Sequence, residues 1–150
     1  MPISQKCQYA LRAIYELARR HKEGPCKIGT IAEAQGIPVR FLENILSNLK
    51  GAGIVDSARG KDGGYFLLRS ADSITVGEVI RFVQGPLGPV DCVTRDFEDC
   101  SFYDDCVFRP LWDRAREALE AVYDGTTFQD LVNQSENNCR SAVCGCGRKR

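Results

Sequence analysis

The stretch IGTIAEAQGIPVRFLENILSNL, residues 28–49, decides the fold. Its first part sets Ile28, Ile31 and Ala32 at helical spacing before Gly36, which predicts a short helix that ends at this glycine. A longer helix begins at Ile37-Pro38, and we expect its buried side to carry five apolar residues, namely Phe41, Leu42, Ile45, Leu46 and Leu49. A short helix, a glycine turn and a second helix indicate a helix-turn-helix.

The residues that follow predict a β-hairpin. Two short extended runs, Ile54-Val55 and residues 65–68, flank the glycine-rich turn at residues 60–64. A hairpin directly after a helix-turn-helix would be the wing of a winged helix. The fold class we predict is therefore mainly α with a small β-hairpin wing.

Two more helices are expected around this unit. Residues 4–20 show helical spacing of apolar side chains, with Ser4 as the N-cap. A helix from Thr75 to Gln84 has Thr75 and Glu78 in the positions of a capping box. Residues 1–84 are therefore assigned to one winged helix-turn-helix domain.

Three cysteines, Cys92, Cys100 and Cys106, lie in a segment that shows no periodicity. We assign residues 85–109 to a sensor loop, because six carboxylates and the three thiols lie between two helical patterns. Thiols gathered in this way indicate a metal or redox centre.

A long helix is predicted from Pro110 to about Asp124. Its apolar stripe exceeds what a small domain needs, so we expect it to be a dimerisation helix that packs on its copy in a second subunit. The alternative is that the stripe packs on its own domain. Residues 110–132 are assigned to this helix and a C-terminal helix, and residues 133–150 to a flexible tail that contains Cys139, Cys144 and Cys146.

Charge divides the chain although its formal net charge is zero. Residues 1–70 hold 11 Lys/Arg and 6 Asp/Glu, whereas residues 71–150 hold 9 and 14, so the two parts carry +5 and −5. A basic part suits a polyanion such as DNA. No apolar run suggests a signal peptide or membrane span, so we expect a cytoplasmic protein whose eight cysteines are reduced.

Four outward residues of the second helix are candidates for reading bases in the major groove: Arg40, Glu43, Asn44 and Ser47. Arg40 can donate to guanine or phosphate, Asn44 can pair with adenine, and Glu43 can accept from cytosine. The alternative is an ordinary solvated helix face.

The hairpin tip offers a second set of DNA contacts, formed by Arg59, Gly60 and Lys61. Arg59 can enter a narrow minor groove, and Gly60 leaves room for the backbone to approach. The alternative is that these charges only solvate the turn. Helix and hairpin together favour double-stranded DNA as the partner.

These motifs resemble the IscR/NsrR-type (Rrf-two) family of winged helix-turn-helix transcriptional regulators. The resemblance rests on residues 9–13 (YALRA), 37–43 (IPVRFLE), 59–60 with 63–65 (RG and GGY), and 76–80 (VGEVI). It implies a bacterial homodimer that binds promoter DNA. It also implies that the three loop cysteines ligate an iron-sulfur cluster, that Glu43 tunes the accepted sequence, and that Arg59 contacts the minor groove.

The donor set leaves the cofactor partly open. Thiolates are the usual ligands of [2Fe-2S] and [4Fe-4S] clusters, whereas structural zinc sites commonly use closer cysteine pairs than the loop offers. The family's fourth ligands, a histidine or a carboxylate, are replaced here by Arg109 and Gln8. We hypothesise that Cys7 completes the site, the alternative being a small buried hydrophobic residue.

The sequence thus predicts a dimeric transcriptional regulator whose operator affinity is set by an iron-sulfur cluster that reports cluster status, redox state or nitric oxide. One alternative is a regulator of the same fold without a cluster, acting through thiol oxidation or a partner protein. A remote alternative is a redox or electron-transfer protein. No nucleotide fingerprint or catalytic triad is present, so we expect neither an enzyme nor a small-molecule substrate.

Overall fold

The computed structural model describes residues 2–94 and 100–141, without the side chains of 139–141. Its elements, in chain order, are α1 (Gln5–Arg19), η1 (His21–Glu23), α2 (Ile28–Gln35), α3 (Val39–Gly51), β1 (Val55–Ala58), β2 (Gly64–Leu67), α4 (Val76–Gln84), η2 (Asp91–Val93), α5 (Arg109–Asp124) and α6 (Phe128–Ser141). The predicted fold class, mainly helical with one hairpin, is confirmed.

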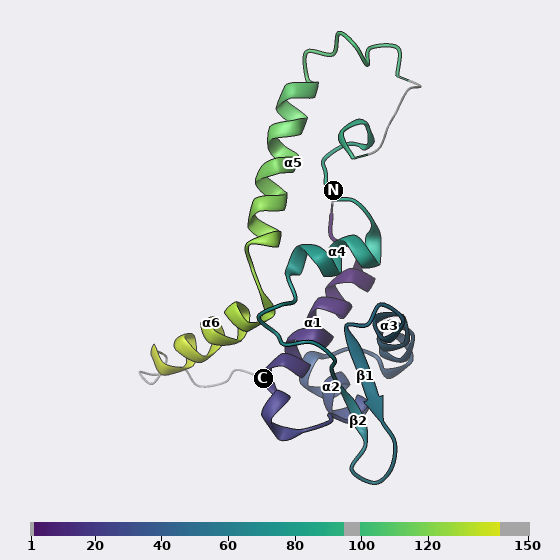
Figure 1. The fold of residues 1–150 in the computed structure, drawn as a ribbon, viewed down its shortest axis with the longest axis vertical. Helices are drawn as coiled ribbons and strands as arrows, with labels where there is room; N and C mark the ends of the chain where they lie inside the picture. The colour runs from purple at the N-terminus through teal and green to yellow at the C-terminus, as the bar shows by residue number, and fades with distance from the viewer. Residues whose placement is uncertain (1, 95–99, 142–150) are drawn as a thin grey trace.

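Helix α1 lies at the centre of the fold (Figure 1). It begins after Ser4, whose hydroxyl accepts a hydrogen bond from the backbone N–H of Cys7 at 3.2 Å, as the N-cap prediction requires. The helix contacts α2, α3, α4 and α6. Its buried face, which includes Ala10, Ala13 and Ile14, therefore organises the core.

Helix α3 buries four of the five apolar residues expected on its inner side, namely Leu42, Ile45, Leu46 and Leu49. For Phe41 the expectation of burial is wrong, because its side chain is 46% exposed. Phe41 lies at the edge of the apolar face, in the first turn of α3, where its ring meets Tyr9 of α1 at 6.4 Å between centroids. The contact with Tyr9 thus covers only part of the ring.

The two strands pair antiparallel, with Val55 opposite Leu67 and Ala58 opposite Gly64. A bridge between Cys26 and Tyr65 joins the hairpin to the chain before α2, through hydrogen bonds of 2.8 Å in both directions. The wing is therefore attached to the helical body along β2 as well as through α3.

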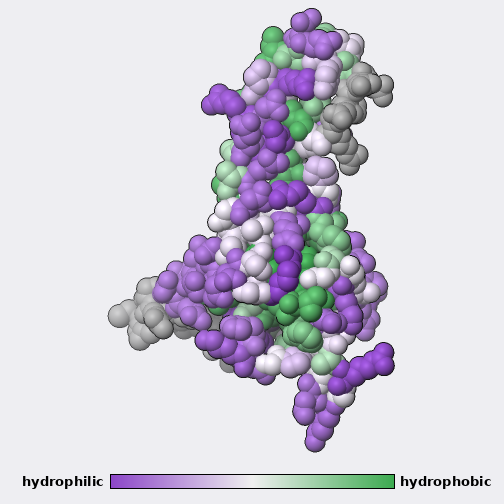
Figure 2. All heavy atoms as spheres, viewed as in Figure 1, coloured by the Kyte–Doolittle hydropathy of each residue, from purple (hydrophilic) through white to green (hydrophobic). Residues whose placement is uncertain are grey.

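The sensor loop and α5 form an arm that projects from the winged-helix body (Figure 1). Helix α5 has 16 residues, none of them buried, and its main contacts are with α4 and η2. Large apolar side chains on the arm are exposed, among them Val107 at 82% and Val122 at 64%. Figure 2 shows apolar atoms along the arm between hydrophilic ones. Exposed apolar side chains along an amphipathic helix are typical of an interface.

Backbone hydrogen bonds join the chain just before α4 to the chain just after α5, while α4 itself packs on α1. Val76 N–H donates to Thr126 O at 2.9 Å, Phe128 N–H donates to Ile74 O at 3.1 Å, and Thr75 and Thr127 form an antiparallel bridge. Phe128 is then fully buried as α6 begins. The chain before α4 and the chain after α5 are therefore joined by backbone hydrogen bonds.

The C-terminal prediction needs a correction. A tail was expected from residue 133, but α6 continues to Ser141. The reason is the anchor at Phe128 and Val132, both buried, from which the helix extends into polar sequence. Cys144 and Cys146 lie outside the described residues, as does the side chain of Cys139.

Candidate DNA-binding surface and cysteine loop

The structure places the four predicted reading residues of α3 on its exposed side: Arg40, Glu43, Asn44 and Ser47. They are spaced by three or four residues, which puts them on one helix face. Asn44 Nδ2 donates to the Arg40 backbone oxygen at 3.4 Å, while the side chains of Glu43 and Ser47 have no hydrogen bond or ion pair shown in the described part of the chain. This face is free to meet a ligand.

A salt bridge connects α3 to the wing. Lys50 Nζ lies 2.8 Å from Asp56 Oδ1 and donates to Ser57 Oγ at 2.8 Å, so the end of the helix is tied to β1. The Lys50 hydrogen bond, supported by the Ser57 backbone N–H, lowers the pKa of Asp56 below its usual value. Lys50 thereby helps to fix the angle between the two predicted DNA contacts.

The wing tip carries Arg59, Gly60 and Lys61, all exposed. Gly60 has φ +106°, a conformation that side chains rarely adopt, and its carbonyl accepts from Gly63 N–H at 3.1 Å to close the turn. The tip extends from the body as a hydrophilic projection at the lower end of the molecule (Figure 2). Arg59 and Lys61, the two basic residues predicted to contact DNA, thus lie away from the core.

A buried carboxylate joins α1 to α2 behind the reading face. Glu16 is fully buried and accepts from Arg19 at 2.6 Å, Arg20 at 2.5 Å and Gln35 at 2.8 Å. Burial alone would raise the pKa of Glu16, but these hydrogen bonds outweigh it and hold the pKa below its usual value. The position of α2 relative to α1 therefore depends on an ionised group.

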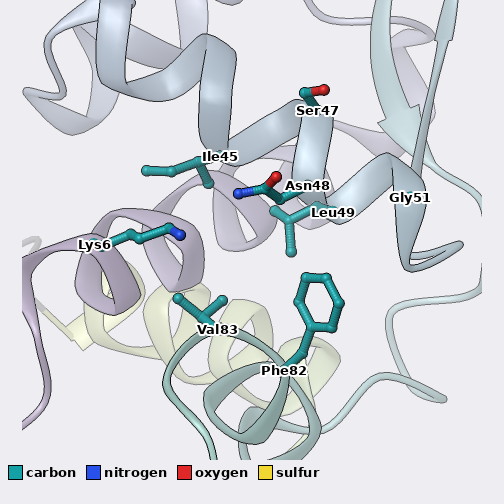
Figure 3. Close-up of a pocket in the computed structure, with 8 residues that line it drawn as sticks. All are labelled: Lys6, Ile45, Ser47, Asn48, Leu49, Gly51, Phe82 and Val83. Carbon is teal, nitrogen blue, oxygen red and sulfur yellow. The ribbon is translucent and has the colours of Figure 1, made fainter.

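A hollow of about 400 Å³ lies beside α3, between α1 and α4 (Figure 3). Lys6 of α1 and Phe82 of α4 point toward Asn48 and Leu49 of α3. A second hollow of about 360 Å³ adjoins it, shares Lys6 and Asn48, and extends to Phe41. The flank of α3 is thus incompletely covered along the side that faces α1 and α4.

The three loop cysteines are all half-buried and none forms a disulfide. Cys92 lies in η2, Cys100 follows residues that are not described, and Cys106 precedes α5. Within residues 2–94 and 100–141, no three His, Cys, Asp or Glu side chains are close enough to hold a metal ion. The donor types suit a cluster, whereas the described positions do not bring three donors together.

Arg109 stabilises the end of this loop. Its guanidinium lies 4.0 Å above the Tyr103 ring, donates to Tyr103 Oη at 3.0 Å and to the Tyr103 carbonyl at 3.3 Å. The bond to Tyr103 is the main reason that the pKa of Arg109 is raised, with smaller contributions from the negative charges of Asp113 and Cys92. A cation thus stands near Cys92.

Cys7 is fully buried in the core of its own domain, and burial raises the pKa of its thiol. This burial favours the alternative of a small buried hydrophobic residue. The role of Cys7 as a fourth cluster ligand stays a prediction. Gln8 is exposed beside it and donates to the Ile3 carbonyl at 3.0 Å.

Sequence reasoning missed the supporting residues of both sites. Lys50 and Glu16 have no motif of their own, because their partners, Asp56 and Gln35, depend on how the elements pack. Arg109 was considered only as a departure from a ligand pattern. An aromatic residue followed six positions later by arginine, Tyr103 and Arg109, is the one local signal that was available.

Comparison with known proteins gives a consistent result. A family model described as "Rrf2: Iron-dependent Transcriptional regulator" matches residues 3–134. The chain is 40% identical over 136 residues to the HTH-type transcriptional regulator CymR of Bacillus subtilis (strain 168), covering 91% of this chain and 93% of that protein. It is 35% identical over 136 residues to the HTH-type transcriptional regulator IscR of Klebsiella pneumoniae (strain 342), covering 91% and 82%. These relatives are named regulators, not enzymes.

Solved structures agree. CymR (YrzC), the global cysteine regulator of B. subtilis, matches with a TM-score of 0.76 and 39% identity, covering 89% of this chain and 98% of that chain. IscR of T. potens matches with a TM-score of 0.77 and 31% identity, covering 98% and 94%. In the described part of this chain, no helix has the length and apolarity needed to cross a membrane.

Proposed function

Because the chain belongs to the Rrf2 family of transcriptional regulators, we propose that it binds operator DNA as a homodimer and that an iron-sulfur cluster on its sensor loop sets the affinity. The observation that carries the DNA part is the exposed face of α3 beside a basic wing tip, with Lys50 bonded to Asp56 between them. The cluster part rests on three half-buried thiols on one loop.

In this proposal, α3 enters the major groove and the wing enters the adjacent minor groove. Arg40, Asn44 and Glu43 supply donors and acceptors for base edges, while Ser47 extends the same face. Arg59 and Lys61 neutralise phosphate or enter a narrow minor groove, with Gly60 allowing close approach.

The arm supports the dimer. None of the residues of α5 is buried, and its exposed side chains include Leu111 and Val122. A second copy would cover this helix. It would also place two winged-helix bodies side by side, as a two-fold operator requires. The distance between the two bodies would then depend on the arm.

The sensor loop suits a cluster by the chemistry of its donors. Cys92, Cys100 and Cys106 would supply three thiolates, and the bound group would supply iron that responds to redox change or nitric oxide. Arg109 and Tyr103 hold the segment that ends at Cys106, since Arg109 N–H also donates to the Cys106 carbonyl at 3.2 Å. If thiolate ligation were lost, the cluster would no longer restrain this segment, and the contacts of Arg109 and Tyr103 would remain.

The cluster-free regulator is the second candidate. Two observations favour it: the described donors do not form a metal-binding group, and the relative that is 40% identical is named CymR, whose solved structure is titled a global cysteine regulator. In that case the loop thiols would respond by oxidation.

Anaerobic reconstitution with iron and sulfide decides between the candidates. The wild type is expected to gain bound iron, sulfide and visible absorption, and Cys92→Ser, Cys100→Ser and Cys106→Ser are each expected to lose them. Cys26→Ser is the matched control, because Cys26 is buried outside the loop. If the wild type gains no cluster, the cluster proposal is contradicted and the cluster-free regulator remains.

DNA reading needs a separate measurement. Binding sites are selected from random duplexes, and the dissociation constant of the selected site is measured at several salt concentrations. Arg59→Ala and Lys61→Ala are each expected to reduce the salt slope by about 1, whereas Arg114→Ala, exposed on α5, should leave it unchanged. Equal affinity of cluster-loaded and cluster-free protein for every site would contradict the sensing role.

A further inference from the structure

Phe41 occupies an unexpected position between the core and the reading face. Its side chain is 46% exposed, although it belongs by spacing to the inner side of α3. On one side its ring meets the ring of Tyr9 at 6.4 Å between centroids, with planes tilted by 46°. On the other side the Arg40 guanidinium carbon lies 4.9 Å from the ring centroid.

The row of contacts continues to the start of α1. Gln5 Nε2 donates to Tyr9 Oη at 3.0 Å, so Gln5, Tyr9, Phe41 and Arg40 form one continuous line across two helices. The α1 end of this line is anchored in the core, because Cys7 and Ala10 of the same helix are fully buried. A motion of the Arg40 side chain away from this ring would therefore break the contact between them.

The ring is the only side-chain partner of Arg40 that the described residues provide. No ion pair or side-chain hydrogen bond to Arg40 is present in residues 2–94 and 100–138, and its backbone oxygen accepts from Asn44. A guanidinium that lies over a ring without a hydrogen-bond partner keeps its N–H donors for another acceptor. Those donors are what a guanine O6/N7 pair would use.

We infer that Tyr9 and Phe41 are positioning residues that hold the Arg40 guanidinium in place before DNA is bound. This inference rests on the proposed role of Arg40 as a base reader. Arginine carries a large rotamer entropy, and a prior contact with an aromatic face reduces what is lost when the side chain is ordered on a base. Phe41 is then needed for base discrimination without touching DNA itself.

The test compares base discrimination in Phe41 variants. On the selected site, every base pair is changed in turn, and the ratio of dissociation constants is measured for wild type, Arg40→Ala, Phe41→Leu and Phe41→Tyr. Arg40→Ala should lose about tenfold discrimination or more at one base pair. Phe41→Leu should lose about two- to fivefold at the same base pair, as expected for an exposed cation–π contact, and Phe41→Tyr should retain the wild-type ratio.

Two controls separate positioning from general damage. Phe82→Leu changes a phenylalanine of the same 46% exposure on α4, away from Arg40, and should leave every ratio unchanged. Phe41→Leu in the Arg40→Ala background should cause no further loss of discrimination. Affinity for a scrambled duplex, which depends mainly on phosphate contacts, should be the same for the wild type and for Phe41→Leu.

The outcomes distinguish the two levels of the proposal. If Arg40→Ala changes no ratio, Arg40 is not a base reader, and both the reading role and the positioning role are overturned. If Arg40→Ala loses discrimination and Phe41→Leu does not, only the positioning role is overturned. Equal losses from Phe41→Leu with and without Arg40 would also overturn it, because the effect would then act through the fold.

Discussion

Gly77 of α4 lies directly against Asp124, the last residue of α5. A Cβ at Gly77 would overlap the Asp124 carboxylate and approach its backbone nitrogen to 3.2 Å. Arg81, one turn later on α4, bonds the same carboxylate at 2.5 Å. The absent side chain at position 77 therefore lets α4 meet the end of the arm at close range.

Gly77→Ala is expected to destabilise the protein by about 1 kcal/mol net. Overpacking typically costs about 1–3 kcal/mol, whereas alanine gains only about 1 kcal/mol over glycine within a helix. Gly29→Ala is the matched control, because Gly29 lies in α2 with no atom within 4 Å of its added Cβ, and this variant should gain stability. Urea unfolding at one protein concentration measures both, and equal gains would contradict the close approach.

Glu16→Gln is expected to cost about 3 kcal/mol of unfolding free energy near neutral pH. The change removes the charge of a buried carboxylate, leaves Arg19 without its ion pair and leaves Arg20 with Glu23 alone. Glu33→Gln, an exposed position on α2, should change stability by less than about 0.5 kcal/mol. Thermal or urea unfolding compares the two, and similar small effects would show that the buried cluster contributes little.

The same carboxylate predicts a pH dependence. The pKa of Glu16 is lower in the folded state than in the unfolded chain, so its contribution is complete above the unfolded value of about 4.3 and is lost as pH falls below it through the folded pKa. Wild-type stability should therefore fall more steeply than that of Glu16→Gln below about pH 4.3. Parallel curves for the two proteins would contradict this assignment.

Thiol reactivity should separate the cysteines into two classes. Cys7 and Cys26 are buried, and burial raises the pKa of both thiols, so their thiolate fraction at neutral pH is reduced. The half-buried Cys92, Cys100 and Cys106 should react faster with iodoacetamide in cluster-free protein. Mass spectrometry of timed samples measures the rates, and labelling in urea is the control, where the differences should disappear.

Val122→Glu is expected to prevent dimerisation. Val122 is 64% exposed on a helix that has no buried residue, and a carboxylate at that position would have to be desolvated in an apolar interface. Arg114→Gln, also exposed on α5, changes the charge without entering the apolar stripe and should remain dimeric. Sedimentation equilibrium at micromolar concentration distinguishes the states, and a dimer of Val122→Glu would exclude this contact.

Local patterns predicted the helices and the wing because each has its own signal. Ser4 and Thr75 cap their helices as expected, with hydroxyls that accept from Cys7 and Glu78. The capping box is only half formed, however, because the Glu78 carboxylate bonds Arg69. Which partner the Glu78 carboxylate bonds depends on residues outside the helix, and the spacing of residues within the helix does not reveal it.

The candidate sites were predicted less completely than the fold. Outward positions on α3 and at the wing tip follow from period and turn chemistry, and the structure exposes all of them. Phe41 was misjudged because it lies at the edge of an apolar helix face. There, a rotation of the helix by a small angle decides whether a side chain is covered, and that angle is set by tertiary packing.

The backbone bridge between Thr75 and Thr127 has an evolutionary consequence. Since Ile74 and Phe128 are held together by a backbone hydrogen bond, the chain from α4 to the end of α5 is an excursion with closed ends, of which α4 packs on α1. Doubling the length of a flexible excursion costs only about 0.6 kcal/mol in chain entropy, and neither end needs to move. We therefore expect that evolution can lengthen, shorten or exchange the segment beyond α4 while the winged-helix body keeps its geometry.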